Sequence, residues 1–164
     1  MISSLRCAAH TVGTLEVPDE IALVYTISGC PLRCPGCHSA DLRDPRLGQV
    51  LDAATLHATL VRYRGLASCV CFLGGEWNPS ALIELLVLAR GQGFTTCLYT
   101  GLNEVSDAIA AHLDYVKLGP FVASRGGLDS PETNQRFLDL RTGRNLTPRF
   151  QNPLGTPAVL EKAA

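Results

Sequence analysis

The chain has no long apolar segment, no basic stripe and no internal repeat. No apolar run approaches the ~20 residues of a membrane-spanning helix. The formal net charge is −1, which argues against binding to a nucleic-acid backbone. Residues 1–6 lack the charged stretch followed by an apolar stretch that marks a signal peptide. These absences predict a cytoplasmic protein with neither a membrane nor a nucleic acid as partner.

The length and composition fit one domain. The chain has 164 residues, of which 46% are hydrophobic, enough for a sizeable core. We expect a single domain over residues 1–164. Its core would span about 16–121, and a Pro- and Gly-richer tail, 122–164, would pack on it.

The chain contains seven cysteines. Without a leader, a disulfide framework is not expected, so these thiols should be metal ligands or small buried residues. Three of them, Cys30, Cys34 and Cys37, form a C-x3-C-x2-C pattern directly after an apolar run.

Three thiolates on one short loop can hold three irons of a [4Fe-4S] cube and leave the fourth iron open for a ligand. The alternatives are a zinc site, with His38 or another cysteine as fourth ligand, and plain buried thiols. No second cysteine pair follows at zinc-ribbon spacing, so the pattern favours the cluster.

Apolar runs and helical patterns alternate along the chain. Strands are predicted at 20–28, 69–73, 94–99 and 115–118, and helices at 52–64, 79–93 and 103–112. A further strand or helix is expected around Phe137. The alternation implies a parallel sheet with crossover helices, but the chain is too short for a full eight-fold barrel. The predicted fold is therefore α/β, a partial, open parallel barrel.

Several motifs follow the predicted strands. The cysteine loop follows the first strand, Gly74-Gly75-Glu76 the second, Thr100-Gly101 the third and Gly119-Pro120 the fourth. The carboxyl ends of parallel strands share one edge, where α/β proteins bind ligands. We therefore expect these loops to form one site.

The cysteine spacing resembles the signature of the radical S-adenosylmethionine (SAM) superfamily. A longer set of segments is similar to the activating proteins of anaerobic (class III) ribonucleoside-triphosphate reductases. These segments are 16–20, 27–39, 71–76, 113–121 and 128–137. Gly36 stands where the wider superfamily often has an aromatic residue, and the reductase activators share this glycine within CPGCH.

The resemblance implies a fold of the radical SAM type and two cofactors. One [4Fe-4S] cluster per chain would be held by Cys30, Cys34 and Cys37, and SAM would chelate its open iron. An electron would then break a sulfur–carbon bond of SAM, giving methionine and a 5′-deoxyadenosyl radical. The implied partners are the large subunit of the anaerobic ribonucleoside-triphosphate reductase, and a flavodoxin or ferredoxin as electron donor.

Contacts to the methionine part of SAM are expected from the second loop. Gly74 and Gly75 would let the backbone approach closely, and Glu76 would accept from the SAM amino group. The alternative is a tight turn with a solvated glutamate.

Contacts to the adenine are expected from Gly36, Cys37 and His38, largely through the backbone. His38 would alternatively bond a cluster sulfide or be a plain loop histidine.

Further candidates for contacts to ribose or carboxylate are Thr100, with Tyr99 and Gly101 beside it, and Asp114 with Lys117. The alternative for the last two is a structural ion pair.

The remaining cysteines carry weaker signals. Cys69, Cys71 and Cys97 are typical of small buried residues, with Cys69 and Cys71 on one face of a strand. Cys7 is expected to be free. The run Asn134-Gln135-Arg136 would close the SAM pocket or meet a partner.

The predicted function is a radical SAM activase that generates a glycyl radical on the reductase. A domain this short leaves the barrel mouth open, which suits a glycine loop delivered by another protein. The alternatives are a radical SAM enzyme acting on another protein or a small molecule, and a non-catalytic zinc-binding adaptor.

Overall fold

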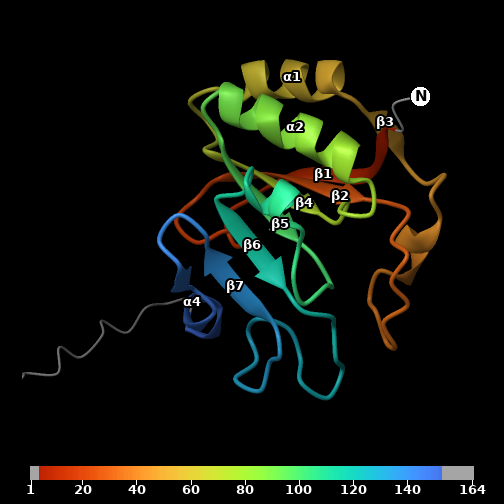
Figure 1. Cartoon of the computed structure of the whole chain (residues 1–164), viewed down its shortest axis with the longest axis vertical. Coiled ribbons are helices and arrows are strands. Elements are labelled where there is room, and N and C mark those ends of the chain that lie inside the picture. Colours follow the sequence, from red (N-terminus) through yellow and green to blue (C-terminus); the bar gives the residue numbers. More distant parts are fainter. Residues whose placement is uncertain (1–3, 153–164) are drawn as a thin grey trace, which may run out of the picture.

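The computed structural model of the protein describes residues 4–152 (Figure 1). Its elements, including the single-turn 3-10 helix η1, are β1 (Leu5–Gly13), β2 (Ala22–Ile27), η1 (Ala40–Arg43), β3 (Gln49–Leu51), α1 (Ala53–Arg62), β4 (Cys69–Leu73), α2 (Pro79–Gly91), β5 (Thr95–Tyr99), α3 (Asp107–Ala110), β6 (Tyr115–Leu118), β7 (Arg136–Asp139), β8 (Arg144–Asn145) and α4 (Pro148–Gln151). Within residues 4–152, no helix has the length and apolarity needed to cross a membrane.

The strands form one mixed sheet in the order β3-β1-β2-β4-β5-β6-β7-β8. Its centre, β2-β4-β5-β6, is parallel throughout, and these are the four strands predicted from the sequence. Antiparallel strands flank them on both sides, with β1 and β3 at one edge and β7 and β8 at the other.

The two long helices agree with their predicted limits. The Asp52 carboxylate accepts a hydrogen bond from the Thr55 amide (2.8 Å) at the start of α1. Asn78 accepts from the Ala81 amide (3.4 Å) at the start of α2, whose first turn contains Pro79. Both are N-caps that satisfy an amide with no partner inside the helix. In Figure 1 the two helices lie together over one face of the sheet, which we call the helix face.

The third predicted helix, 103–112, is much shorter in the structure. Only Asp107–Ala110 is helical, because the Ser106 side chain accepts from the Ile109 amide (3.4 Å) and starts the helix there. The preceding residues turn toward β7, where Arg136 donates to the Asn103 carbonyl (3.4 Å). The element expected around Phe137 is the strand β7.

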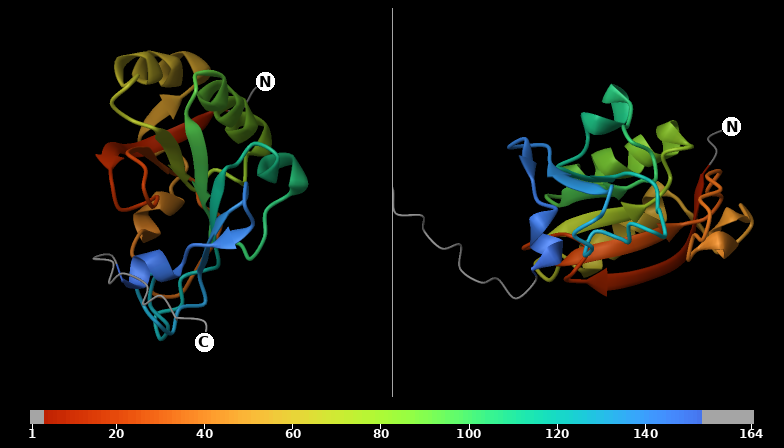
Figure 2. Two further views of the ribbon diagram at one scale, coloured as in Figure 1. Left: turned by 90° about the vertical axis from the view of Figure 1, so that its left-hand side faces the viewer. Right: turned by 90° about the horizontal axis from the view of Figure 1, so that it is seen from below.

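The opposite face of the sheet, which we call the inner face, carries a second buried cluster. It is built from Cys69, Cys71, Cys97, Tyr115 and Phe137, together with Val17 from the loop between β1 and β2. The three cysteines are fully buried, which confirms their prediction as small buried residues. Helix α4 lies at the other end of the molecule from α1 and α2 (Figures 1 and 2).

The predicted tail, 122–164, contributes β7 and β8 to the sheet and α4 beside it. Residues 153–164 lie outside the described part of the chain.

The helix-face core provides a first test. Leu86 of α2 is fully buried, whereas its neighbour Val87 is 50% exposed. We expect Leu86→Ala to lower the free energy of unfolding by about 2–5 kcal/mol, because it removes buried methyl groups and leaves a cavity. Val87→Ala should change it by about 0.5 kcal/mol or less. Urea titrations of both variants would check this, and equal effects would contradict the assigned faces.

Candidate functional site

The cysteine loop projects from the carboxyl end of β2 and is tied down at its base (Figure 1). The Ser28 hydroxyl donates to the Leu47 carbonyl (2.8 Å), and the Gly29 amide donates to the Leu42 carbonyl (2.7 Å). Gly29 has a φ of +88°, and a Cβ there would lie 3.3 Å from Pro45. The base of the loop therefore needs glycine at this position.

Cys30, Cys34 and Cys37 are free, partly buried thiols on this loop. The Cys37 amide donates to the Cys34 carbonyl (3.2 Å), so a tight turn joins these two. Burial, and then the charges of Glu76, Cys34 and Cys37, raise the pKa of Cys30. As the side chains stand, no three cysteine, histidine or acidic groups in residues 4–152 are close enough to hold a metal ion.

A cavity of about 210 Å³ lies where the loops after the parallel strands meet. It is lined by Ile27, Cys30, Cys37, Ser39, Leu42, Leu73, Gly74, Glu76, Trp77, Tyr99, Thr100, Gly101 and Lys117. The structure thus brings two of the loop cysteines together with Glu76, Thr100 and Lys117, as strand direction predicted.

Glu76 is a largely buried carboxylate in this wall. Its Oε1 accepts from the Thr100 hydroxyl (2.5 Å), whereas its Oε2 is buried and has no hydrogen-bond partner in the described part of the chain. Burial raises the pKa of Glu76, while the Thr100 hydroxyl and the Lys117 charge act against that shift. A buried acceptor without a donor is costly, so Oε2 is suited to a donor from a ligand.

Lys117 is the buried cation of the cavity. Its ammonium donates to the carbonyls of Gly119 (2.8 Å) and Thr100 (3.3 Å). Burial lowers its pKa to about 8, and the nearby charges of Cys34 and Glu76 oppose this effect. An ammonium has three protons, so one remains for a ligand.

The structure does not bring Asp114 to the cavity. Its carboxylate accepts from the Thr96 amide (2.9 Å) and hydroxyl (3.2 Å) and pairs with Arg90 at 4.0 Å. The ion pair with Lys117 considered from the sequence is therefore not formed. Residues three apart in an extended strand point to opposite faces, which explains why the two separate.

The two glycines before Glu76 both adopt positive φ, +89° at Gly74 and +110° at Gly75. A Cβ at Gly74 would lie 2.6 Å from the ring of Trp77, and one at Gly75 would lie 3.2 Å from Leu5. Trp77 covers Gly74 and lines the cavity, a role that sequence reasoning missed. Its position directly after Glu76, as the only tryptophan of the chain, was the available signal.

His38 and Gly36 lie outside the cavity lining. The exposed His38 ring packs on Phe121, with 4.8 Å between ring centroids, and a Cβ at Gly36 would meet Ala123 at 3.7 Å. Both contacts join the cysteine loop to the loop that follows β6. The structure therefore places these residues between two loops at the edge of the site.

The run Asn134-Gln135-Arg136 holds the loop after β6. The side-chain amides of Asn134 (3.0 Å) and Gln135 (3.5 Å) both donate to the Pro120 carbonyl. Arg136 is exposed at the start of β7. None of the three lines the cavity.

The side chains present fit an iron–sulfur cluster with a further ligand. Three free thiols on one loop are the donors that such clusters use. Glu76, whose Oε2 is buried and unpartnered in the described part of the chain, lines the same cavity as two of them.

Comparison with known proteins agrees with this chemistry. A family model described as a 4Fe-4S single cluster domain matches residues 21–128, well over half of the chain. The match runs from β2 to beyond β6 and includes the cysteine loop and the residues that line the cavity. No curated protein matches the chain. The chain is therefore an iron–sulfur protein and belongs to the family of 4Fe-4S single cluster domains.

Proposed function

We propose that the protein is a radical SAM activase with a partial, open parallel α/β barrel, and that it generates a glycyl radical on an anaerobic ribonucleoside-triphosphate reductase. Cys30, Cys34 and Cys37 would hold the cluster and leave one iron for SAM. The observation that carries the proposal is Glu76, which lines a cavity with Lys117 and two of the cysteines and whose Oε2 is buried without a partner in the described part of the chain.

When bound, the reduced cluster and SAM supply a 5′-deoxyadenosyl radical, with methionine as the second product, for hydrogen abstraction from a glycine. The chain's own groups bind and orient the amino-acid end of SAM. Glu76 Oε2 accepts a hydrogen bond from the amino group of SAM, and the remaining N–H of the Lys117 ammonium donates one to the carboxylate of SAM. Gly74 leaves room for the Trp77 ring, which lines the cavity beside these groups.

Ile27, Leu73 and Tyr99 line the cavity beside these polar groups. A ligand that displaces water from this part of the cavity would strengthen each electrostatic contact there. The volume of about 210 Å³ is below the ~300–1000 Å³ typical of a pocket for a whole drug-sized ligand. It suits the methionine end of SAM, with the adenosyl end toward the loop edge where Gly36 and His38 lie.

The resemblance of segments 16–20, 27–39, 71–76, 113–121 and 128–137 to reductase activators supports the choice of partner. The partner is then the reductase large subunit, and the electron donor is a flavodoxin or ferredoxin.

The direct test is anaerobic reconstitution with iron and sulfide, reduction, and addition of SAM with and without a candidate reductase. We expect 5′-deoxyadenosine to form and a glycyl radical signal to appear on the reductase by electron paramagnetic resonance. Nucleoside without that signal would keep the SAM chemistry and replace the partner by another protein or a small molecule. A colourless protein that holds zinc and forms no nucleoside would overturn the proposal.

The ligand assignment predicts that Cys34→Ala abolishes cluster binding, because two thiolates remain where three are needed. Iron and sulfide per chain after reconstitution should fall to background. Cys7→Ala is the matched control, since Cys7 is a free, partly buried thiol in β1, and it should retain the cluster. A brown Cys34→Ala protein with full iron content would refute the assignment.

The role of Glu76 predicts that Glu76→Gln weakens SAM binding about ten-fold or more, because a charge-assisted hydrogen bond becomes a neutral one. The cluster content should not change, since the amide keeps the shape of the side chain. Glu84→Gln, on the exposed side of α2, serves as the control. SAM dissociation constants of the reconstituted proteins measure the effect, and equal values in all three would reduce Glu76 to a turn residue.

A further inference from the structure

Residues 16–20 form a motif that the site does not use, and we call them the plug segment. They connect β1 to β2 and lie against the inner face of the sheet. Val17 is fully buried there and packs with the cluster around Cys71, Cys97 and Phe137. Val17 thus anchors the plug segment in the core, whereas Asp19 of the same segment is exposed.

Two tyrosines on the inner face anchor the plug segment at both of its ends. The Tyr115 hydroxyl donates to the Glu20 carboxylate (2.9 Å), which also accepts from Thr95 (3.1 Å). The Tyr99 hydroxyl donates to the main-chain carbonyl of Glu16. Burial raises the pKa of Tyr99, so this hydroxyl stays protonated and donates at neutral pH.

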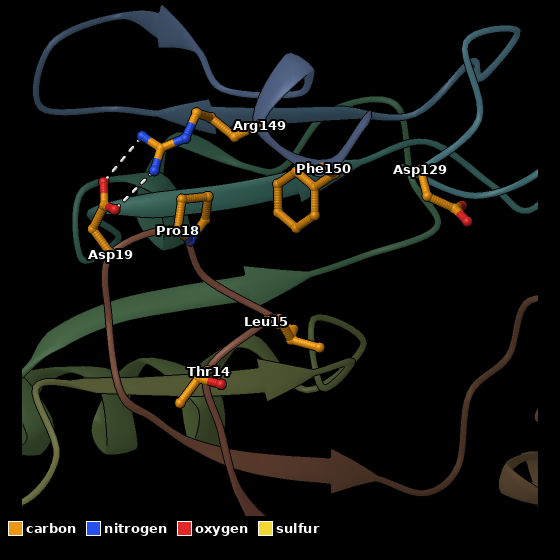
Figure 3. A pocket seen from close by; sticks show the side chains of 7 residues that line it. All are labelled: Thr14, Leu15, Pro18, Asp19, Asp129, Arg149 and Phe150. Carbon is orange, nitrogen blue, oxygen red and sulfur yellow. Dashed lines mark hydrogen bonds and ion pairs between the residues drawn. The ribbon is translucent and has the colours of Figure 1, made fainter. Parts of the chain in front are cut away.

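The outer side of the plug segment is held by α4. Asp19 has a φ of +65°, an unfavourable conformation for a residue other than glycine. Its carboxylate accepts two hydrogen bonds from the Arg149 guanidinium (3.1 and 2.8 Å). Figure 3 shows this paired contact beside Pro18 and Phe150. The plug segment is therefore fixed from the inner face and from the outer side.

Tyr99 links the plug segment to the cavity, because the residue lines the cavity while its hydroxyl donates to the Glu16 carbonyl. Tyr115 has the same kind of anchor but does not line the cavity. We propose that the plug segment positions Tyr99 as the fixed wall against which the amino-acid end of SAM is held. This inference rests on the proposed function, and it makes Tyr99 a binding residue and Glu16 and Val17 positioning residues.

The pair Tyr99→Phe and Tyr115→Phe tests this in the reconstituted protein, with SAM itself as the probe in equilibrium dialysis. Each variant loses a hydroxyl bonded to the plug segment and keeps its ring, so each should lower the melting temperature slightly. The SAM dissociation constant should rise about five-fold in Tyr99→Phe, because one hydrogen bond that fixes the wall is lost. It should rise about two-fold or less in Tyr115→Phe, because that variant loosens only the Glu20 end of the plug segment and Tyr115 does not line the cavity.

A second variant tests the route through Val17. Val17→Ala should loosen the plug segment and raise the SAM dissociation constant in the wild-type background. In the Tyr99→Phe background it should add little, because coupled residues are not additive. Full additivity would overturn the positioning role.

The outcomes separate this inference from the proposed function. If the wild-type protein binds SAM and Tyr99→Phe binds it with the same dissociation constant, the inference is overturned and the proposed function stands. An equal loss of affinity in Tyr99→Phe and Tyr115→Phe would show general loosening and would also overturn it. A cluster-bearing wild-type protein that fails to bind SAM would overturn both.

Discussion

The parallel pairing of β2, β4, β5 and β6 is the constraint on which the site depends. Ladder registers such as Thr26 with Leu73, Leu73 with Tyr99, and Tyr99 with Lys117 set the ends of neighbouring strands level with one another. The loops that follow these strands must then gather at one edge. A cysteine loop, a glycine turn with its carboxylate, and a buried lysine meet there although they are far apart in the sequence.

The inner face shows how a sheet with few helices on that side is kept filled. Three cysteines supply small side chains along β4 and β5, which leaves room for Phe137 and the plug segment to pack against them. The tyrosine hydroxyls in this layer all find acceptors on the plug segment, as buried polar groups require. The packing that fills the inner face therefore also fixes the side chain at the wall of the cavity.

The sequence was informative where one local rule decides the outcome. Asp52 and Asn78 start the long helices, and apolar runs mark the parallel strands, so these elements were predicted closely.

The sequence was less informative where tertiary contacts decide the structure. Only Leu5 of the antiparallel strand β1 is buried, so this strand has no continuous apolar run, and β8 has only two residues. The cap at Ser106 starts α3 later than the helical pattern over 103–112 predicted. Asp114 was grouped with Lys117 by proximity in sequence, although alternation along the strand separates them. The position of Trp77 in the cavity lining depends on how the turn at Gly74 and Gly75 folds, which the sequence alone does not give.

The charges of the cavity wall are arranged for a particular kind of ligand. Burial raises the pKa of Glu76 and lowers that of Lys117, so it opposes the charged form of each. Each group partly offsets the shift of the other, because their charges are opposite. A ligand that carries both an ammonium and a carboxylate complements Glu76 and Lys117 at once. A purely cationic or purely anionic ligand would be attracted by one of these two groups and repelled by the other. Such a pair confers selectivity more than raw affinity. The amino-acid end of SAM has this zwitterionic form, so the charge pattern of the wall supports our proposal of SAM over a nucleotide or a simple acid of similar size as the ligand.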